Sequence, residues 1–370
     1  MEAVKPDIGF KRELGRLSAS QLNQCMQCGT CSAVCSLAPA DRPFPRKEMI
    51  RAAWGMQDKL LGNVDVWLCH QCGDCSTSCP RDVKPASVIA AVRQKTYEHY
   101  MRPRFLARMV SRPALLPVAI AIPVVVIIVI LSLAGTFNPL RMAVTFSIPD
   151  GAVDYSAFFP HVWLNSTFTA LTFLFWGLAL LGIARFRKDM KRITPPGETR
   201  HRPLFKVLGE ILSHSNFSGC GSQQSRRWAH MLVFFGFALL ILVTLYAIVA
   251  SILELYPLSF WNPFKIAGNV ASLMIYTGIG IMIWQRIRRK DVFGKSSYND
   301  WFLLISVLLL TLSGTLVEAA RFGNWAIAYP LYFFHLVVVW FVVMYLPFTK
   351  LGHVFYRTAA LLYARSIGRK

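Results

Sequence analysis

The chain has 370 residues, of which 54% are hydrophobic, and a formal net charge of +21. So apolar a composition excludes a single soluble domain, which would expose far more polar surface. The charge would suit a nucleic-acid binder only if it gathered on one surface, so its position along the chain decides its meaning. Eight of the nine cysteines lie between Cys25 and Cys79, and apolar residues concentrate after Pro113. We therefore expect two domains, residues 1–112 and residues 113–370.

The start of the chain, from Met1 to Asn23, contains no apolar run of the length found in signal peptides. We therefore expect the cysteine-rich domain to remain in the cytoplasm, where it is made. Thiols stay reduced in that compartment, so we interpret the eight cysteines as metal ligands and not as disulfide partners.

Two cysteine runs share the spacing C-x2-C-x2-C-x3-C, and Pro80 follows the second run. This is the ligand spacing of bacterial two-cluster ferredoxins, in which the fourth cysteine of each run binds the other cluster. Three thiolates on one tight loop reach three corners of a [4Fe-4S] cube, and the other run supplies the fourth ligand. We therefore predict two clusters, the first held by Cys25, Cys28, Cys31 and Cys79 and the second by Cys69, Cys72, Cys75 and Cys35.

A pair of zinc sites is the alternative interpretation of these cysteines. Zinc favours separated C-x2-C pairs with four ligands per ion, and the third cysteine of each run fits that pattern poorly. Ser36 stands where a proline usually follows the first run, a departure that affects loop geometry and not the number of ligands. Apolar residues at helical spacing predict helices over residues 46–61 and 85–100, so we expect a helical domain around the clusters.

Six later segments are long and apolar enough to cross the roughly 30 Å hydrocarbon layer as helices. Lys and Arg number 17 before the first segment, 10 and 5 in two loops and 5 in the tail, whereas three other connections hold only Arg141, Lys265 and Arg321. This alternation predicts a multi-pass protein of the cytoplasmic membrane with both termini in the cytoplasm, and it leaves no charge that calls for nucleic acid. The predicted spans are residues 113–134, 162–184, 228–253, 266–284, 301–320 and 329–349. The predicted fold is all-α, a helical two-cluster ferredoxin domain followed by a six-span bundle.

Histidines in or beside these spans are candidate haem ligands. His230 and His353 lie near the cytoplasmic ends of the third and sixth spans, at similar depth, and neutral imidazole suits haem iron. We predict that they bind an inner haem b. His335 lies 18 residues before His353, which is five turns and roughly 27 Å along one regular helix, unless Pro347 kinks it. His161 has about the same depth as His335, so the two form a candidate outer haem b pair; alternatively, His161 is an interfacial residue among headgroups.

The paired cysteine runs, the helical insert between them and the segment from Cys75 to Pro85 (CSTSCPRDVKP) resemble the HdrC subunit of heterodisulfide reductases. The fusion of such a domain to a six-span bundle resembles the QmoC family, the membrane subunits of quinone-interacting oxidoreductase complexes. The bundle is also similar to the nitrate reductase gamma subunit family of b-type cytochromes. That family usually carries a second histidine where this sequence has Leu240, so the outer haem lacks its usual partner.

The loop between the second and third spans contains an amphipathic stretch, residues 203–215, followed by Cys220. Its His214 is either a quinone-site or alternative haem residue, or part of a surface helix that anchors the cysteine-rich domain or a partner. Glu318 and Arg321 at the outer end of the fifth span serve either proton release or an interfacial ion pair. No G-x-G-x-x-G follows a predicted strand, which argues against a flavin or nicotinamide fold.

These patterns indicate an electron-transfer subunit that links menaquinone, through haem b and two [4Fe-4S] clusters, to a cytoplasmic partner. The resemblance implies QmoA- and QmoB-like flavin and iron-sulfur subunits as partners and adenylylsulfate reductase as the terminal acceptor. The alternatives are the membrane arm of a heterodisulfide-reductase-like complex, with fused HdrC and HdrE functions and a non-quinone donor, and a membrane redox sensor. The direction of electron flow and the side of the quinone site stay open, because reduction potentials depend on the surroundings of each centre.

Overall fold

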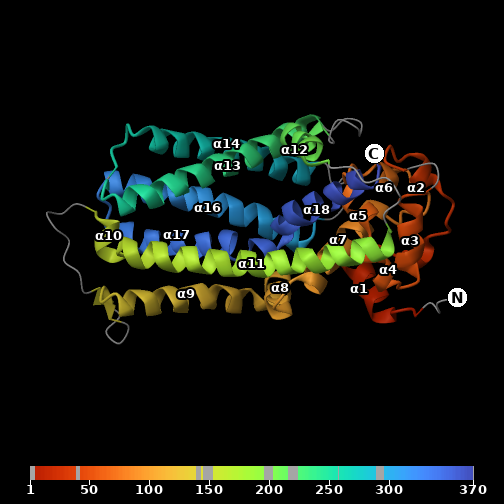
Figure 1. The fold of residues 1–370 in the computed structure, drawn as a ribbon, viewed down its shortest axis with the longest axis horizontal. Helices are drawn as coiled ribbons and strands as arrows, with labels where there is room; N and C mark the ends of the chain where they lie inside the picture. The colour runs from red at the N-terminus through yellow and green to blue at the C-terminus, as the bar shows by residue number, and fades with distance from the viewer. Residues whose placement is uncertain are drawn as a thin grey trace.

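A computed structural model describes residues 5–38, 42–138, 143–144, 153–195, 203–215, 224–256, 258–288 and 296–369. Two residues discussed above, Arg141 and Cys220, lie outside the residues that the structure describes. Nearly all described elements are helices; a short antiparallel pair, β1 (Phe137–Asn138) and β2 (Ala143–Val144), is the exception. A bundle of long helices forms one end of the molecule and a cluster of short helices the other, and both chain termini lie at the short-helix end (Figure 1).

The N-terminal part consists of short helices arranged around α7 (Pro85–Tyr100), which begins with a proline at a position where no backbone donor is needed. The predicted helix over residues 46–61 is divided in two, because Gly55 has a φ of +66° and a Cβ there would lie 2.3 Å from the Asp7 carbonyl oxygen. The other elements are α1 (Ile8–Ser18), η1 (Leu22–Gln24), α2 (Thr30–Ala33), α3 (Arg46–Ala53), α4 (Gln57–Leu60), α5 (Val64–Leu68), α6 (Asp74–Thr77) and α8 (Arg104–Ser111).

Five helices of the described chain are long and apolar enough to cross a membrane, and they run side by side in the bundle (Figure 1). They are α9 (Leu116–Leu133) with the preceding η2 (Pro113–Leu115), α11 (His161–Ile193), α13 (Gln224–Ile252), α14 (Pro263–Arg288) and α16 (Tyr298–Phe322). The short α10 (Tyr155–Phe158) lies at the end of the bundle far from the termini. The chain therefore has the character of a membrane protein.

The sixth predicted span is shorter than expected and does not continue to residue 349. It forms α17 (Ala328–Val343), whose 16 residues extend roughly 24 Å. Pro347 lacks a backbone donor, and a Cβ on Gly352 would lie 2.6 Å from the Pro347 carbonyl oxygen, so the chain turns tightly here. His335 and His353 are therefore not on one regular helix, and the alternative of a break at Pro347 holds. The turn consists of η5 (Leu346–Phe348) and η6 (Lys350–Gly352), and α18 (His353–Ser366) follows.

Two glycines bring α13 and α14 into close contact. A Cβ on Gly236 would lie 2.7 Å from the Ile275 side chain, and a Cβ on Gly278 would lie 2.7 Å from the Ala229 carbonyl oxygen. Small residues at such crossings let helix backbones approach in a membrane, where dispersion contacts and not hydrophobic exclusion hold helices together. This packing sets the position of His230 on α13 relative to the rest of the bundle.

The cysteine-rich part and the bundle share one hydrophobic core. Trp67 of α5 is fully buried and stacks on Tyr356 of α18, with ring centroids 5.1 Å apart. Phe186 of α11 contacts Trp67 edge-on at 5.9 Å, and the Tyr100 hydroxyl donates to Asp189 at 2.8 Å. Helices from both halves therefore hold each other in a defined orientation.

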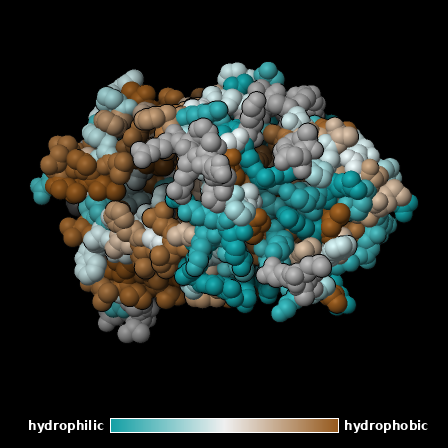
Figure 2. Space-filling model, turned by 45° about the vertical axis from the view of Figure 1, so that its right-hand side comes forward, coloured by the Kyte–Doolittle hydropathy of each residue, from teal (hydrophilic) through white to brown (hydrophobic). Residues whose placement is uncertain are grey.

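The surface divides in the same way. Figure 2 shows hydrophobic residues over the bundle and hydrophilic residues over the cysteine-rich part. Phe173, Leu180 and Leu273 are large exposed apolar side chains of bundle helices. The amphipathic helix α12 (Leu204–Ser213) begins where residues 203–215 predicted it, and Phe205 on its outer face is 87% exposed. An exposed apolar face next to a bundle of this kind suits the interfacial layer of a membrane.

Candidate functional site

The two cysteine runs fold as copies of one structural unit. Gln27 and Gln71, at matching positions, both have positive φ angles of 58° and 54°, and the glycines that follow, Gly29 and Gly73, have φ angles of 87° and 97°. A short helix, α2 or α6, begins directly after each glycine. These left-handed residues turn the chain so that the thiols of a run face one point.

Each unit surrounds a small cavity together with one cysteine of the other unit. One cavity is lined by Cys25, Cys28, Cys31 and Cys79. The other is lined by Cys35, Cys69, Cys72 and Cys75. These are the two groups of four that the crossed ligand pattern predicts, and their role as cluster ligands stays a prediction. Among the described residues no three His, Cys, Asp or Glu side chains converge tightly enough for a single metal ion, whereas a cubane spreads its ligands more widely.

The surroundings of the thiols disfavour uncompensated thiolates. Burial, with the charge of Cys69 nearby, raises the pKa of the Cys75 thiol well above its usual range. Burial also raises the pKa values of Cys31 and Cys35. Thiolate ligands here therefore need a cationic centre that offsets their charge, and the iron of a cluster supplies it.

The same position in the two units has opposite surroundings. His70, which follows the first cysteine of the second unit, accepts a hydrogen bond at its Nδ1 from Arg357 of α18, at 2.8 Å. Burial and the nearby Arg357 charge lower the pKa of His70 to about 3, so the imidazole is neutral. Met26, its counterpart in the first unit, is 61% exposed. The second unit thus contacts the bundle, and the first faces outward.

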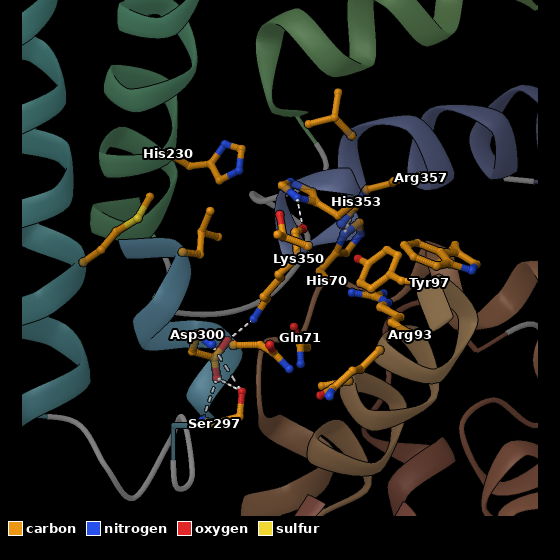
Figure 3. A pocket seen from close by; sticks show the side chains of 18 of the residues that line it. His70, Gln71, Arg93, Tyr97, His230, Ser297, Asp300, Lys350, His353 and Arg357 are labelled. Atoms are coloured by element: carbon orange, nitrogen blue, oxygen red, sulfur yellow. Dashed lines mark hydrogen bonds and ion pairs between the residues drawn. The ribbon is translucent and has the colours of Figure 1, made fainter. Parts of the chain in front are cut away.

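A larger cavity, of about 310 Å³, lies between the second cysteine unit and the bundle. His70 and Gln71 line both this cavity and the small one around the second group of cysteines. From the bundle, His230 and His353 face the same space (Figure 3). Their ring centroids are 6.2 Å apart. Two neutral imidazoles that face one cavity would hold a haem iron, which supplies a one-electron carrier there.

Hydrogen bonds at Nδ1 orient both rings. His353 donates from Nδ1 to the Lys350 carbonyl oxygen at 2.9 Å. His214 Nδ1 lies 3.3 Å from the Leu212 carbonyl oxygen, which can only accept, so His214 Nε2 accepts from His230 Nδ1 at 2.8 Å. Metal-bound histidines commonly donate their second N–H in this way, which fixes tautomer and ring orientation. Burial lowers the pKa of His353 to about 4 and keeps it neutral, as ligation requires. The residues present therefore fit a bis-histidine haem b.

Sequence reasoning left open two roles for His214, a cofactor role or a place on a surface helix. The structure places it directly after α12, where it is buried and hydrogen-bonded to His230. Its φ of 50° turns the chain back toward α13. The spacing of apolar residues does not predict the contact between His214 and His230, because that contact depends on how the segment after α12 folds over the bundle. The sequence offered one signal for it, a histidine at the end of an amphipathic helix.

The candidate outer pair has separate partners. His335 on α17 lies 2.8 Å from the Ser313 hydroxyl through its Nδ1 and packs against Gly314, where a Cβ would lie 3.2 Å from the imidazole. His161 begins α11 and contacts the Tyr256 ring, with centroids 5.2 Å apart. The structure records no ring contact between the two histidines within the described ranges.

Glu318 and Arg321, for which proton release and an interfacial ion pair were both open, have separate partners. Glu318 forms an ion pair with Lys265 at 3.0 Å, and Arg321 donates to the Leu258 carbonyl oxygen at 2.8 Å. The ion pair joins α14 to α16, and the Arg321 bond joins α16 to the segment before α14, so both have a structural explanation that needs no proton release.

A family model for citrate utilization protein B matches residues 113–370, more than half of the chain. The chain belongs to the citrate utilization protein B family. A second family model, the 4Fe-4S dicluster domain, matches residues 21–83, which include both cysteine units. The N-terminal part is therefore an iron-sulfur domain.

Individual relatives agree with this division. Citrate utilization protein B of Escherichia coli is 26% identical over 358 residues, covering 91% of this chain and 88% of the relative. A protein of Archaeoglobus profundus that is itself described as similar to HdrC of heterodisulfide reductase is 39% identical over 85 residues, covering 23% of this chain and 45% of the relative. The C2 component of the H(2)/formate:CoB-CoM heterodisulfide,ferredoxin reductase of Methanococcus maripaludis is 33% identical over 101 residues, covering 25% and 54%.

This chain thus spans about half the length of its heterodisulfide reductase relatives, and the match to them confirms an HdrC-like electron-transfer domain. A membership of the QmoC family is not established by these matches. No solved structure gives a significant match.

Proposed function

We propose that this protein is the quinone-reactive membrane component of a multi-subunit oxidoreductase, and that it connects the menaquinone pool to a cytoplasmic redox partner. Two [4Fe-4S] clusters are held by the two cysteine groups that surround the small cavities. A haem b is held by His230 and His353. When bound, it supplies a one-electron carrier between two-electron quinone chemistry and the clusters.

The observation that supports this proposal is the shared wall between the large cavity and the cavity of the second cysteine group. His70 and Gln71 line both the large cavity and the cavity of the second cysteine group. Cys79 follows the helix of the second unit yet lines the cavity of the first group, so the two groups share one folded unit. The candidate sites are therefore neighbours, since the large cavity adjoins the second cysteine group and the two cysteine groups belong to one folded unit.

The first cysteine unit is the exit toward a partner. Cys28 is exposed, and a hydrogen bond with Thr30 lowers the pKa of its thiol. Met26 and Val34 add exposed apolar surface beside it. A redox partner that docks here would approach the first cluster closely, whereas the bundle covers the second unit. The second cluster would therefore be the one nearer the bundle, and the first cluster the one nearer the docked partner.

The orientation follows from charge. Most Lys and Arg residues of the sequence lie before the first span, in the segment between α11 and α13 and in the tail. The cysteine-rich part, α12 and α18 lie toward one end of the molecule (Figure 1). By the positive-inside rule this end lies on the cytoplasmic side of the cytoplasmic (inner) membrane. The shorter α17 completes a sixth crossing if the local hydrocarbon layer thins or flanking residues adjust to it.

Two partner classes fit the proposal. The resemblance to quinone-interacting complexes implies QmoA- and QmoB-like flavin and iron-sulfur subunits, with adenylylsulfate reductase as the terminal acceptor. The full-length similarity to citrate utilization protein B implies a redox partner that serves citrate utilization. Affinity purification of the chain from its native membrane, with identification of the flavoprotein that co-purifies, separates the two.

The test of the proposed function is a visible spectrum of the chain purified anaerobically in detergent, recorded before and after a menaquinol analogue and then dithionite. Haem is quantified as the pyridine haemochrome. We expect b-type bands that respond to quinol, and their loss in His230→Ala and His353→Ala. The matched control is His99→Ala, since His99 lies in the cysteine-rich part and does not line the large cavity. Iron-sulfur absorption without haem in the unmodified chain would refute the haem assignment.

A further inference from the structure

Basic side chains gather where the iron-sulfur domain joins the bundle. Residues 101–120, which lead into the first span, include four arginines and no Asp or Glu. Residues 176–188, at the end of the second span, include Arg185, Arg187 and Lys188 and again no acidic residue. Both segments therefore bring only positive charge to the junction.

Close packing holds these two segments against each other. A Cβ on Gly182 of α11 would lie 3.1 Å from the Met101 sulfur and 3.2 Å from the Tyr100 carbonyl oxygen. Arg102 directly follows Met101, and Arg185 lies three residues after Gly182, nearly one helical turn along α11. The end of the iron-sulfur domain and a bundle helix therefore bring arginines to one place (Figure 1).

Three of these cations lie close enough to repel one another. Partial burial and the charges of Arg104 and Arg185 lower the pKa of Arg102. Asp189, which follows on α11, forms its ion pair with Arg192, at 3.5 Å. Among the described residues, none of the three arginines has an ion pair or a side-chain hydrogen bond. The cluster formed by Arg102, Arg104 and Arg185 therefore favours an anion from outside the chain.

Large apolar side chains are exposed beside this arginine cluster. On α8, Phe105 is 61% exposed and lies between the exposed residues Arg104 and Arg108. On α11, Leu180 and Leu181 are also exposed, within five residues of the arginine on that helix. Exposed apolar residues suit the hydrocarbon layer, and basic residues suit the headgroup layer next to it. The arginine cluster therefore lies at the level of lipid headgroups.

The chemistry of this surface selects its ligand. A guanidinium donates two parallel hydrogen bonds to the oxygens of a phosphate, and it is the side chain best suited to bind one. A phospholipid supplies a phosphate for the arginines and acyl chains for the adjacent apolar residues. Three cations without acidic partners favour a headgroup with net negative charge over one that carries its own cation.

We propose that Arg102, Arg104 and Arg185 form a binding site for the phosphate of an anionic membrane phospholipid. Its acyl chains lie against Phe105 and the exposed leucines of α11. Phosphatidylglycerol and cardiolipin belong to this class of lipid, whereas phosphatidylcholine is zwitterionic. Because two of the arginines lie at the end of the iron-sulfur domain and one on a bundle helix, one bound lipid connects the two parts of the chain.

Native mass spectrometry of the purified full-length chain in neutral detergent, titrated with phosphatidylglycerol or phosphatidylcholine, measures the binding of single lipids. The unmodified chain should bind phosphatidylglycerol more tightly. Replacing any one of the three arginines by Gln should weaken that binding about fivefold, which corresponds to about 1 kcal/mol for one basic side chain near an anionic lipid. Arg185→Lys keeps the charge and should retain most of the affinity. Arg12→Gln is the matched control, since it removes an exposed arginine from α1, at the short-helix end of the molecule.

Preferential binding of phosphatidylglycerol that weakens in the three Gln variants, and not in Arg12→Gln, supports the site. Equal binding of the two lipids by the unmodified chain, or equal affinities in the Gln variants and Arg12→Gln, refutes it. If glycerol phosphate, which has no acyl chains, displaces the lipid at similar concentration, the arginines bind soluble phosphate esters and the lipid assignment is wrong.

Salt provides a second test that needs no variant. Added salt screens exposed charges, so phosphatidylglycerol binding to the unmodified chain should weaken as the ionic strength rises. Binding that does not depend on salt would overturn the proposal even if an arginine variant fails to fold. Neither measurement involves haem, quinone or electron transfer, so its failure leaves the proposed function intact.

Discussion

Replacing Trp67 by alanine should loosen the junction between the iron-sulfur domain and the bundle. Trp67 is 1% exposed and packs against Tyr97, Phe186 and Tyr356 at centroid distances of 5.7, 5.9 and 5.1 Å. Truncation of a fully buried tryptophan costs about 3–5 kcal/mol, since both the transfer free energy and the aromatic contacts are lost. Every tenfold change corresponds to about 1.4 kcal/mol, so the local opening equilibrium should rise by a factor of roughly 10² to 4 × 10³.

Hydrogen exchange measured by mass spectrometry on the detergent-solubilised chain reports this opening directly. Peptides from α5 (Val64–Leu68) and α18 (His353–Ser366) should exchange faster in Trp67→Ala, because each loses its main partner across the junction. Trp54→Ala is the control: Trp54 lies in the same domain but is 59% exposed, so its removal should cost less than about 0.5 kcal/mol. Equal exchange in the two variants would refute a shared core as the basis of the junction.

Three further changes follow from the same geometry. Cys28→Ser and Cys72→Ser should each remove one cluster and so halve the iron bound in clusters. Only Cys72→Ser should alter the haem potential, since the second cysteine unit borders the large cavity. Identical effects on the haem potential would contradict the assignment of the second cluster as the one nearer the bundle. Gly62→Ala should destabilise the junction by about 1–3 kcal/mol, because its Cβ would lie 2.8 Å from the Ile193 side chain. Gly209→Ala should be tolerated, because nothing lies within 4 Å of a Cβ there. The temperature at which cluster absorbance is lost compares the stability of the two variants. Burial and Arg104 lower the pKa of His99, so below its ordinary pKa of about 6.5 the unfolded state takes up a proton that the folded state resists. Folding stability should therefore fall as the pH decreases through 6.5, and His99→Gln should flatten that dependence in denaturant titrations.

Local patterns predicted much of this architecture. The start of α7 at Pro85, the amphipathic α12 and the five long apolar helices follow from proline position, apolar spacing and length, which are properties of short segments. The two groups of cysteines around the small cavities also match the grouping that their spacing predicts, because a tight loop offers few ways to direct three thiols.

Features that depend on tertiary contacts were not predictable from such patterns. The break after Val343 depends on how closely Gly352 approaches Pro347, and hydropathy does not record that contact. The bond from His230 to His214 and the contacts of Arg226 and Arg357 with the Cys69–Cys72 loop join segments far apart in the chain. Lys265, which forms an ion pair with Glu318, lies 53 residues before it, so local spacing does not predict that contact.

The most direct test of the central claim is electron exchange between the clusters and a quinone within one preparation. The chain is reduced with dithionite, freed of excess reductant under anaerobic conditions and mixed with a menaquinone analogue, while the cluster absorbance and EPR signals are followed. We expect rapid reoxidation of the clusters in the unmodified chain and much slower reoxidation in His353→Ala with its clusters intact. Clusters that ferricyanide oxidises but the quinone does not, or equal rates in the two proteins, would contradict a route from the clusters through the bundle to the quinone pool.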